Sequence, residues 1–226
     1  MRSGASLIPF VAVLLILLGC HVVYGASTAT QGPSSLSLIS TVQPLPADGG
    51  TYPSLMVTVG DVAGNPTVTL SSMTIFLSSS QDSVATVLPT VELTAGHTYV
   101  LVNVTTTEKP GTTAITAASG GLKSASADLE TVGAGQTPTQ LALSISPSKT
   151  LQSFVGDDAL VAIQLMNGSS LPAYSDGLTQ VIITSSNTSV VENTMTLTIP
   201  PGKSYAYSPI KAKNSGETTF TALSSG

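Results

Sequence analysis

Short apolar runs alternate with turn residues along most of the chain. From Leu36 onward, stretches rich in Val, Ile and Thr are separated by Gly, Pro, Asn and Asp at intervals of roughly eight to twelve residues. No stretch keeps the 3.6-residue period of an amphipathic helix. We therefore predict an all-β fold built from β-sandwiches.

The first half of the chain contains enough strand-like runs for one sandwich of about seven strands. Each run is rich in β-branched residues and ends at a turn signal. The predicted strands are residues 36–42, 54–62, 73–78, 90–93, 98–105, 112–118 and 125–132.

The second half of the chain repeats the first at a displacement of 106 residues, with a one-residue gap near the end. We therefore predict two tandem sandwiches, residues 34–132 and 139–226, joined by a short Gly/Pro linker at 133–138. The matching segments are 79–84 on 185–190, 111–117 on 216–222 and, more loosely, the turn 61–66 on 167–172.

Three motifs of the first repeat carry a family resemblance. They are Asp-x-x-Gly-Asn-Pro at 61–66, Ser-Ser-x-x-Ser-Val-Ala-Thr-Val at 79–87 and Pro-Gly-Thr-Thr-Ala-Ile-Thr-Ala at 110–117. This pattern resembles the bacterial Ig-like repeats of invasin, intimin and other prokaryotic cell-surface proteins, and it covers nearly all of the chain after the N-terminal segment. The resemblance implies an Ig-like sandwich in a stalk, an adhesin or an appendage, and it implies no catalytic residues.

The second repeat lacks a counterpart of the strand predicted at 125–132, because the sequence reaches Ser225-Gly226 at the equivalent point. A sandwich without its last strand exposes core side chains and unpaired backbone groups. Three explanations remain open. The chain is the N-terminal piece of a longer reading frame, another subunit donates an extended segment such as residues 26–42, or the second sandwich tolerates an incomplete sheet.

The N-terminus has the form of a secretory signal peptide, residues 1–25. Arg2 precedes an apolar run at 7–18, and the small residue Gly25 precedes a predicted cut before Ala26. Two alternatives remain: a lipid on Cys20 within a sequence that resembles a bacterial lipobox, and an uncleaved anchor at 7–24, which is just long enough to span a membrane. In each case we expect a secreted or cell-surface protein.

Cysteine and tryptophan usage limits the kind of Ig-like domain. Cys20 is the only cysteine and the chain contains no Trp. The exported part therefore has no intramolecular disulfide, and it lacks the tryptophan that packs on that disulfide in antibody domains. We predict sandwiches held together by packing and strand pairing alone.

Charge and motif content argue against nucleic-acid binding and catalysis. Only 8% of the residues are charged, with 7 Lys and Arg against 12 Asp and Glu, so a polyanion is repelled. His97 is the only histidine outside the N-terminal segment, which leaves no base beside a nucleophile. We predict no catalytic residues and no cofactor. Asp61, Asn65, Asp157 and Asp158 offer oxygen atoms that a calcium ion could use, but no EF-hand spacing supports such a site and we predict no metal site.

Candidate modification sites follow from three sequons, at Asn103, Asn167 and Asn187. Asn167 and Asn187 are expected in turns. Asn103 depends on strand parity: it points outward if Val102 and Val104 face the core, and inward if Tyr99 and its counterparts Tyr205 and Tyr207 do. We favour partial core burial of the tyrosines. The other parity makes them an aromatic patch for a sugar or a neighbouring domain.

The sequence therefore predicts a non-catalytic extracellular structural or adhesive module, a stalk or spacer within a longer prokaryotic surface protein. Its expected partners are neighbouring Ig-like domains or subunits, or a surface glycan or protein, with a membrane tether through the N-terminal segment as an alternative. Other interpretations are a carbohydrate- or receptor-binding module using loops 61–66 and 168–175 or the tyrosine face, a subunit of a donor-strand filament, and an accessory to an enzyme encoded beyond residue 226.

Overall fold

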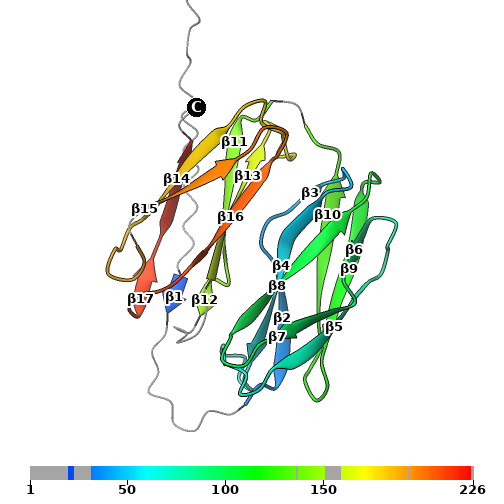
Figure 1. Ribbon diagram of the computed structural model, residues 1–226, viewed down its shortest axis with the longest axis vertical. Helices are drawn as coiled ribbons and strands as arrows, with labels where there is room; N and C mark the ends of the chain where they lie inside the picture. The colour runs from blue at the N-terminus through cyan, green and yellow to red at the C-terminus, as the bar shows by residue number, and fades with distance from the viewer. Residues whose placement is uncertain (1–19, 23–31, 136, 151–158, 193, 225–226) are drawn as a thin grey trace, which may run out of the picture.

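The computed structural model describes residues 20–22, 32–135, 137–150, 159–192 and 194–224. These residues form β-strands joined by turns and loops, and no helix occurs among them. The strands build two stacked pairs of sheets that lie side by side (Figure 1). The predicted all-β sandwich fold is confirmed.

The first sandwich comprises β2 to β10, and all seven predicted strands are present within two or three residues of their predicted bounds. The short strands β3 and β6 were not predicted. One sheet has the order β2 (Ser35–Ser40), β4 (Thr51–Gly60), β8 (Tyr99–Thr106) and β6 (Ala85–Val87). The other has the order β3 (Leu45–Pro46), β10 (Ala125–Val132), β9 (Gly111–Ala118), β5 (Met73–Ser79) and β7 (Thr90–Leu93).

The second sandwich comprises β11 to β18. One sheet has the order β11 (Gln140–Ser146), β13 (Ala159–Met166) and β16 (Tyr205–Ile210). The other has the order β15 (Thr194–Ile199), β14 (Thr179–Ser185) and β18 (Phe220–Ser224). A small third sheet joins β12 (Lys149–Thr150), β1 (Cys20–Val22) and β17 (Gly216–Thr218).

Each sandwich has its own hydrophobic core, supplied by alternate residues of facing strands. Leu55, Val57 and Val59 of β4 face the first core, which is built from residues between Leu36 and Leu129. The second core is built from residues between Leu141 and Ala222. Two cores agree with two repeats, while the boundaries at 34–132 and 139–226 stay predictions.

The repeat is visible in the turn that follows β4 and β13. The Asp61 carboxylate accepts hydrogen bonds from the backbone N–H groups of Ala63 and Asn65, both at 2.9 Å. The Asn167 side-chain oxygen accepts from Ser169 and Leu171 in the same way, at 2.9 and 3.0 Å. This side-chain capping of a turn is what Asp and Asn do best in loops. The loose sequence match of the two turns is therefore a structural match.

A second repeated device joins the start of a loop to the strand opposite. In the first sandwich the Ser79 and Thr113 hydroxyls lie 2.8 Å apart, and Thr113 also accepts from the backbone N–H of Gln81. In the second sandwich Ser185 and Thr218 lie 2.7 Å apart, and Thr218 accepts from Asn187. We call this pair of hydroxyls the Ser–Thr latch. It explains why the Ser-Ser motif recurs in the sequence.

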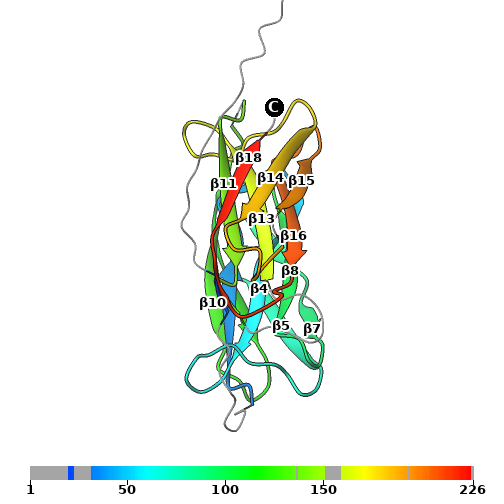
Figure 2. The same cartoon turned by 90° about the vertical axis from the view of Figure 1, so that its left-hand side faces the viewer.

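The two sandwiches pack face to face, sheet against sheet, as the two views of the ribbon show (Figures 1 and 2). Every residue of β13 is buried. Val161, Ile163 and Leu165 belong to the second core, whereas Leu160, Ala162 and Gln164 are fully buried without belonging to it. Their face of β13 meets the first sandwich, because the Gln164 side chain donates to the carbonyl of Pro44 at 3.0 Å.

Candidate functional site

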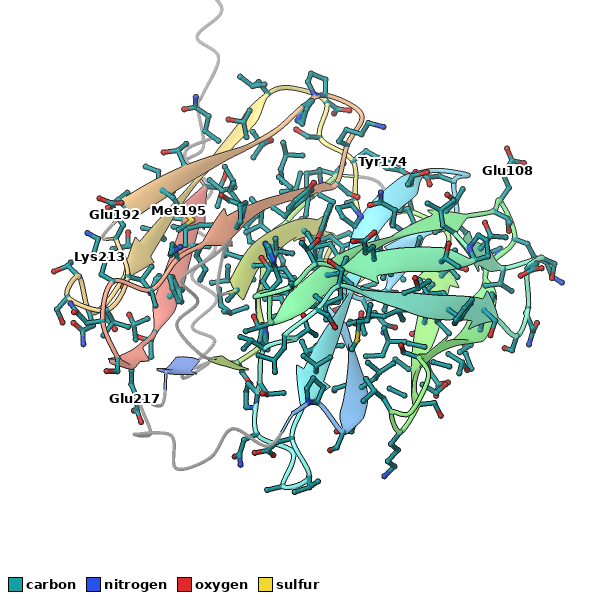
Figure 3. All side chains as sticks on the ribbon, turned by 60° about the horizontal axis from the view of Figure 1, so that its bottom comes forward. Glu108, Tyr174, Glu192, Met195, Lys213 and Glu217 are labelled. Carbon is teal, nitrogen blue, oxygen red and sulfur yellow. The ribbon has the colours of Figure 1, made fainter. Side chains whose placement is uncertain are left out.

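Asp48, in the loop between β3 and β4, holds the junction of the two sandwiches together. Its carboxylate accepts hydrogen bonds from the Tyr52 hydroxyl at 2.7 Å and the Gly50 backbone N–H at 2.8 Å within the first sandwich. It also accepts from the Tyr174 hydroxyl of the second sandwich, again at 2.7 Å. Figure 3 shows Tyr174 between the two sets of strands. One charged group thus takes donors from both sandwiches, and charge-assisted hydrogen bonds are the stronger kind.

The pKa values at this junction reflect the shared carboxylate. Asp48 remains exposed, and the partial burial of its carboxylate by itself raises the pKa. The hydrogen bonds from Tyr174, Tyr52 and Gly50 outweigh this effect and leave the pKa below its ordinary value. Burial, followed by the hydrogen bond to Asp48, raises the pKa of Tyr52 and of Tyr174. Both phenols are therefore protonated donors and Asp48 is an ionised acceptor at neutral pH.

A side chain at Gly50 would displace the groups of this junction. A Cβ on Gly50 would lie 2.8 Å from a carboxylate oxygen of Asp48 and 2.9 Å from the hydroxyl oxygen of Tyr52. Both distances are shorter than any ordinary contact of a Cβ atom. The backbone approaches the carboxylate closely because no side chain intervenes.

Tyr205, on β16, forms the second contact between the sandwiches. Its hydroxyl donates to the carbonyl of Pro53 at 3.0 Å, and its ring meets that of Tyr52 edge-on with 6.3 Å between centroids. Tyr207 stacks on Tyr205 at 6.0 Å. Burial raises the pKa of Tyr205 to about 12, although its hydrogen bond with Thr41 acts in the opposite direction.

The parity favoured for the tyrosines was wrong. Val102 and Val104 face the first core and Asn103 is exposed, while in β16 the residues Ala206 and Ile210 face the second core. Tyr205 and Tyr207 point away from their own core. Tyr205 is partly buried against the core of the first sandwich. It therefore follows the other parity, in which the tyrosines face outward and contact a neighbouring domain. Tyr207 remains 43% exposed.

A shallow cleft of about 360 Å³ lies at this tyrosine junction. Tyr52, Tyr205 and Tyr207 line it together with Lys203 and Pro200. Aromatic faces beside hydroxyl groups and one lysine can stack on a flat ligand and donate hydrogen bonds to it. Within the described residues no group of three His, Cys, Asp or Glu side chains is close enough to hold a metal ion.

The two loops named as candidate binding loops are not brought together. Loop 61–66 follows β4, and the other candidate loop, 168–175, reaches Asp48, which precedes β4, through Tyr174. A ten-residue strand separates these points by about 33 Å. Loop 61–66 instead lines a separate cleft of about 700 Å³ with residues of β2 and residues 144–148.

The other candidate residues fall at scattered positions. Asn167 and Asn187 are half-buried, and their side chains hold their own turns; the Asn187 amide also donates to the carbonyl of Glu217 at 3.1 Å. His97 lies 3.3 Å from the carbonyl of Ala95 in its own turn. Asp157 and Asp158 lie outside the described residues, as does most of the predicted signal peptide, and Cys20 is seen only as part of the backbone of β1.

Sequence reasoning did not find Asp48, Tyr52, Tyr174 or Gln164. One signal pointed to their surroundings: the run at 159–166 is apolar at every position except Gln164, which indicates a strand buried on both faces. Such a strand in the second sandwich requires a partner surface outside its own core.

In the described part of the chain, no helix is long and apolar enough to cross a membrane.

The chain resembles several solved structures at low sequence identity. No protein-family model and no curated protein sequence matches the chain. Solved structures that it resembles include surface layer protein SbsC, domains 1–6 (16% identity, TM-score 0.40, 74% of this chain and 21% of that one). Others are the D0-D1 domain of intimin (15%, 0.33, 85% and 91%) and invasin, a bacterial integrin-binding protein (17%, 0.35, 84% and 36%).

The sheets of the chain themselves define its structural class, all-β sandwiches. The solved structures that it resembles include intimin and invasin, the proteins whose repeats the sequence motifs resemble. The chain spans about a fifth of the SbsC fragment that it resembles. A β-glucuronidase from glycoside hydrolase family 2 also matches, at 13% identity and a TM-score of 0.38, over 30% of its length. Identities this low describe fold alone.

Proposed function

We propose that the chain is a non-catalytic extracellular module that acts as a rigid structural or adhesive unit of a prokaryotic surface protein. The observation that carries the proposal is the locked junction: Asp48, Tyr52, Tyr174 and Tyr205 tie two sandwiches into one body. A stalk or a layered array keeps its shape when neighbouring domains hold a fixed orientation relative to each other. The low content of charged residues and the signal-like N-terminus support an exported location.

The arrangement of side chains supports a role without catalysis. His97 is bonded to its own turn, and the Ser–Thr latches place hydroxyls against other hydroxyls rather than against a base. Asp48 is fully occupied by donors, so it is not an acid or base that awaits a substrate. These groups build structure.

The direct test of location is protease treatment of intact cells that express the native protein. We expect the protein to be degraded while a cytoplasmic marker survives. Survival of both in intact cells, with degradation of both after lysis, would contradict an extracellular module. If washing the cells releases the protein from their surface as a monomer, that result would argue against a stalk.

A second candidate function is binding of a glycan or a receptor at the tyrosine cleft, favoured by the exposed face of Tyr207 beside Lys203. Glycan-array binding of the purified protein tests it, with Tyr207→Ala as the variant. Leu178→Ala is the matched control, because Leu178 is also exposed and lies outside the cleft. Binding that Tyr207→Ala reduces at least tenfold and the control leaves intact supports this function. No binding, or equal loss in both variants, would contradict it.

We also propose Asn103 as the best-placed glycan acceptor if the host glycosylates Asn-x-Thr, because its side chain is exposed on β8. Asn167 and Asn187 are half-buried. The side-chain nitrogen of Asn187, the atom that would carry a glycan, already donates to the carbonyl of Glu217. Peptide mass spectrometry of the native protein distinguishes the three. Occupancy at Asn187 with none at Asn103 would contradict this order.

A further inference from the structure

The strand β1 occupies in the second sandwich the position that the end of β10 occupies in the first. In the first sandwich β10 lies between β3, which runs parallel to it, and β9, which runs antiparallel. In the second, β1 lies between β12, parallel, and β17, antiparallel. The two local sheets therefore have the same order and the same strand directions.

The residue register is the same as well. Thr131 of β10 pairs with Leu45 on one side and Gly111 on the other. Val22 of β1 pairs with Thr150 and Gly216. Both partners of Val22 lie 105 residues after the partners of Thr131. For Gly111 and Gly216 this is the spacing of the repeat after its one-residue gap. Val22 thus stands in the place of Thr131.

Two independent features confirm that Gly216 and Gly111 are equivalent. A Cβ on Gly111 would touch Val84, and a Cβ on Gly216 would touch Val190, its repeat counterpart. Two residues further on, Thr113 and Thr218 make the same Ser–Thr latch. By the same register, Cys20 pairs with Thr218 as Leu129 pairs with Thr113.

The position of Leu129 is a core position. Leu129 is fully buried in the first core, and among the described strands only β14 pairs with β18 in the second sandwich. An extended apolar segment fits this site, because it adds backbone hydrogen bonds and covers core side chains together. The sequence leading into Cys20 is apolar throughout residues 7–18.

We propose that Cys20–Val22 of the same chain is the closing strand of the second sandwich, so that this N-terminal segment is part of the fold until it is removed. Cleavage before Ala26 then opens a strand-acceptor site along β17. The segment 26–42, considered above as a donor to another subunit, is not free for this role over its whole length, because Ser35–Ser40 is already β2.

The single native cysteine allows a direct test. Directly paired residues of antiparallel strands have Cα atoms about 4.5–5.5 Å apart, which is within disulfide reach. The full chain carrying Thr218→Cys is produced without signal processing, oxidised and examined by non-reducing electrophoresis and thiol counting. We expect a monomer with an intramolecular disulfide and both thiols lost. Thr113→Cys is the matched control and keeps both thiols, because Leu129 occupies the facing position.

Two outcomes would overturn the proposal. Free thiols in a Thr218→Cys chain that melts like the parent would show that β1 does not lie beside β17. Disulfide-linked dimers without the intramolecular form would assign the site to a second copy instead. If Thr218→Cys fails to fold, the pair His21→Cys and Glu217→Cys in a Cys20→Ser background tests the same register, since Glu217 is exposed and pairs with His21.

A protease site inserted between Gly25 and Ala26 of the Thr218→Cys chain tests the opening step. After cutting, we expect the N-terminal fragment to stay attached while the disulfide is oxidised and to dissociate after reduction. Reduction should also lower the thermal midpoint of the cut chain by several degrees. An unchanged midpoint after the fragment has dissociated would contradict a role of β1 in the fold.

Discussion

The two sandwiches share their local devices and differ in how they are closed. Both have the capped turn after the second long strand and the Ser–Thr latch. The first sandwich is closed by the eight-residue β10, and Gln43 adds hydrogen bonds to the backbone of Asp128 and Glu130 on its outer edge. The second is closed by the three-residue β1.

This difference separates features that depend on nearby residues from a feature that depends on a distant segment of the chain. Turns and latches depend on side chains a few residues apart or on one opposite strand, so they are copied whenever the repeat is copied. Closure of the sheet depends on a segment that comes from elsewhere in the chain. The second sandwich is therefore expected to be the less stable one, and its edge is the place where another strand can act.

The largest expected effect comes from truncating the closing strand of the first sandwich. Leu129→Ala removes a fully buried side chain from a core, which costs about 2–5 kcal/mol of unfolding free energy. The matched change Cys20→Ala, at the equivalent position of the shorter strand, is expected to cost less than about 1 kcal/mol. Urea denaturation of the full chain measures both. Equal costs would show that the two closing strands contribute alike.

A smaller effect is expected where a valine lies against a glycine in both sandwiches. A Cβ at position 216 lies 2.6 Å from Val190, and the backbone φ there is +150°, whereas a Cβ at position 111 lies 3.0 Å from Val84. Gly216→Ala should cost about 1–3 kcal/mol and Gly111→Ala less. A Val190→Ala background should relieve the steric part of the Gly216→Ala cost. No relief in thermal denaturation would contradict the contact.

The junction should respond to pH through Asp48. Its pKa in the folded protein lies below the ordinary value of 3.8, so its stabilising contribution is complete above that value and is lost as the pH falls through the folded pKa. Because Asp48 is exposed, Asp48→Asn should cost only about 1 kcal/mol at neutral pH. The difference between parent and variant, measured by denaturation from pH 6 to pH 2, should vanish at the acid end. A constant difference would contradict an ionised acceptor.

The smallest effect concerns the repeated turn. Gly64 has φ of +79°, and Ser170 stands at the equivalent place with φ of +58°. Gly64→Ala should cost about 1 kcal/mol, because a side chain in the left-handed region is strained. Ser170→Gly should be neutral or stabilise by less than about 1 kcal/mol. A thermal midpoint that rises in Gly64→Ala, or one that falls in Ser170→Gly, would show that the two turns are not equivalent.

Strands, repeats and turns were predictable because their signals are local. Alternation places Leu55, Val57 and Val59 inward, and Asp or Asn caps a turn wherever it occurs. The junction was not predictable from the repeat, since Asp48, Tyr52 and Tyr174 have no counterparts of the same type in the other copy. The tyrosine parity failed for a related reason: on β16 the small residue Ala206 packs against its own core, while Tyr205 packs against the core of the other sandwich.

The central claim is that the two sandwiches form one rigid body, packed face to face. Spin labels at Glu108→Cys and Asp176→Cys, both exposed and one in each sandwich, report the distance between them in a Cys20→Ser background. Pulsed electron resonance should give one narrow distance distribution that broadens when Tyr205→Ala and Asp48→Ala are added. A broad distribution in the parent protein, unchanged by those substitutions, would show that the sandwiches move independently and would contradict the account.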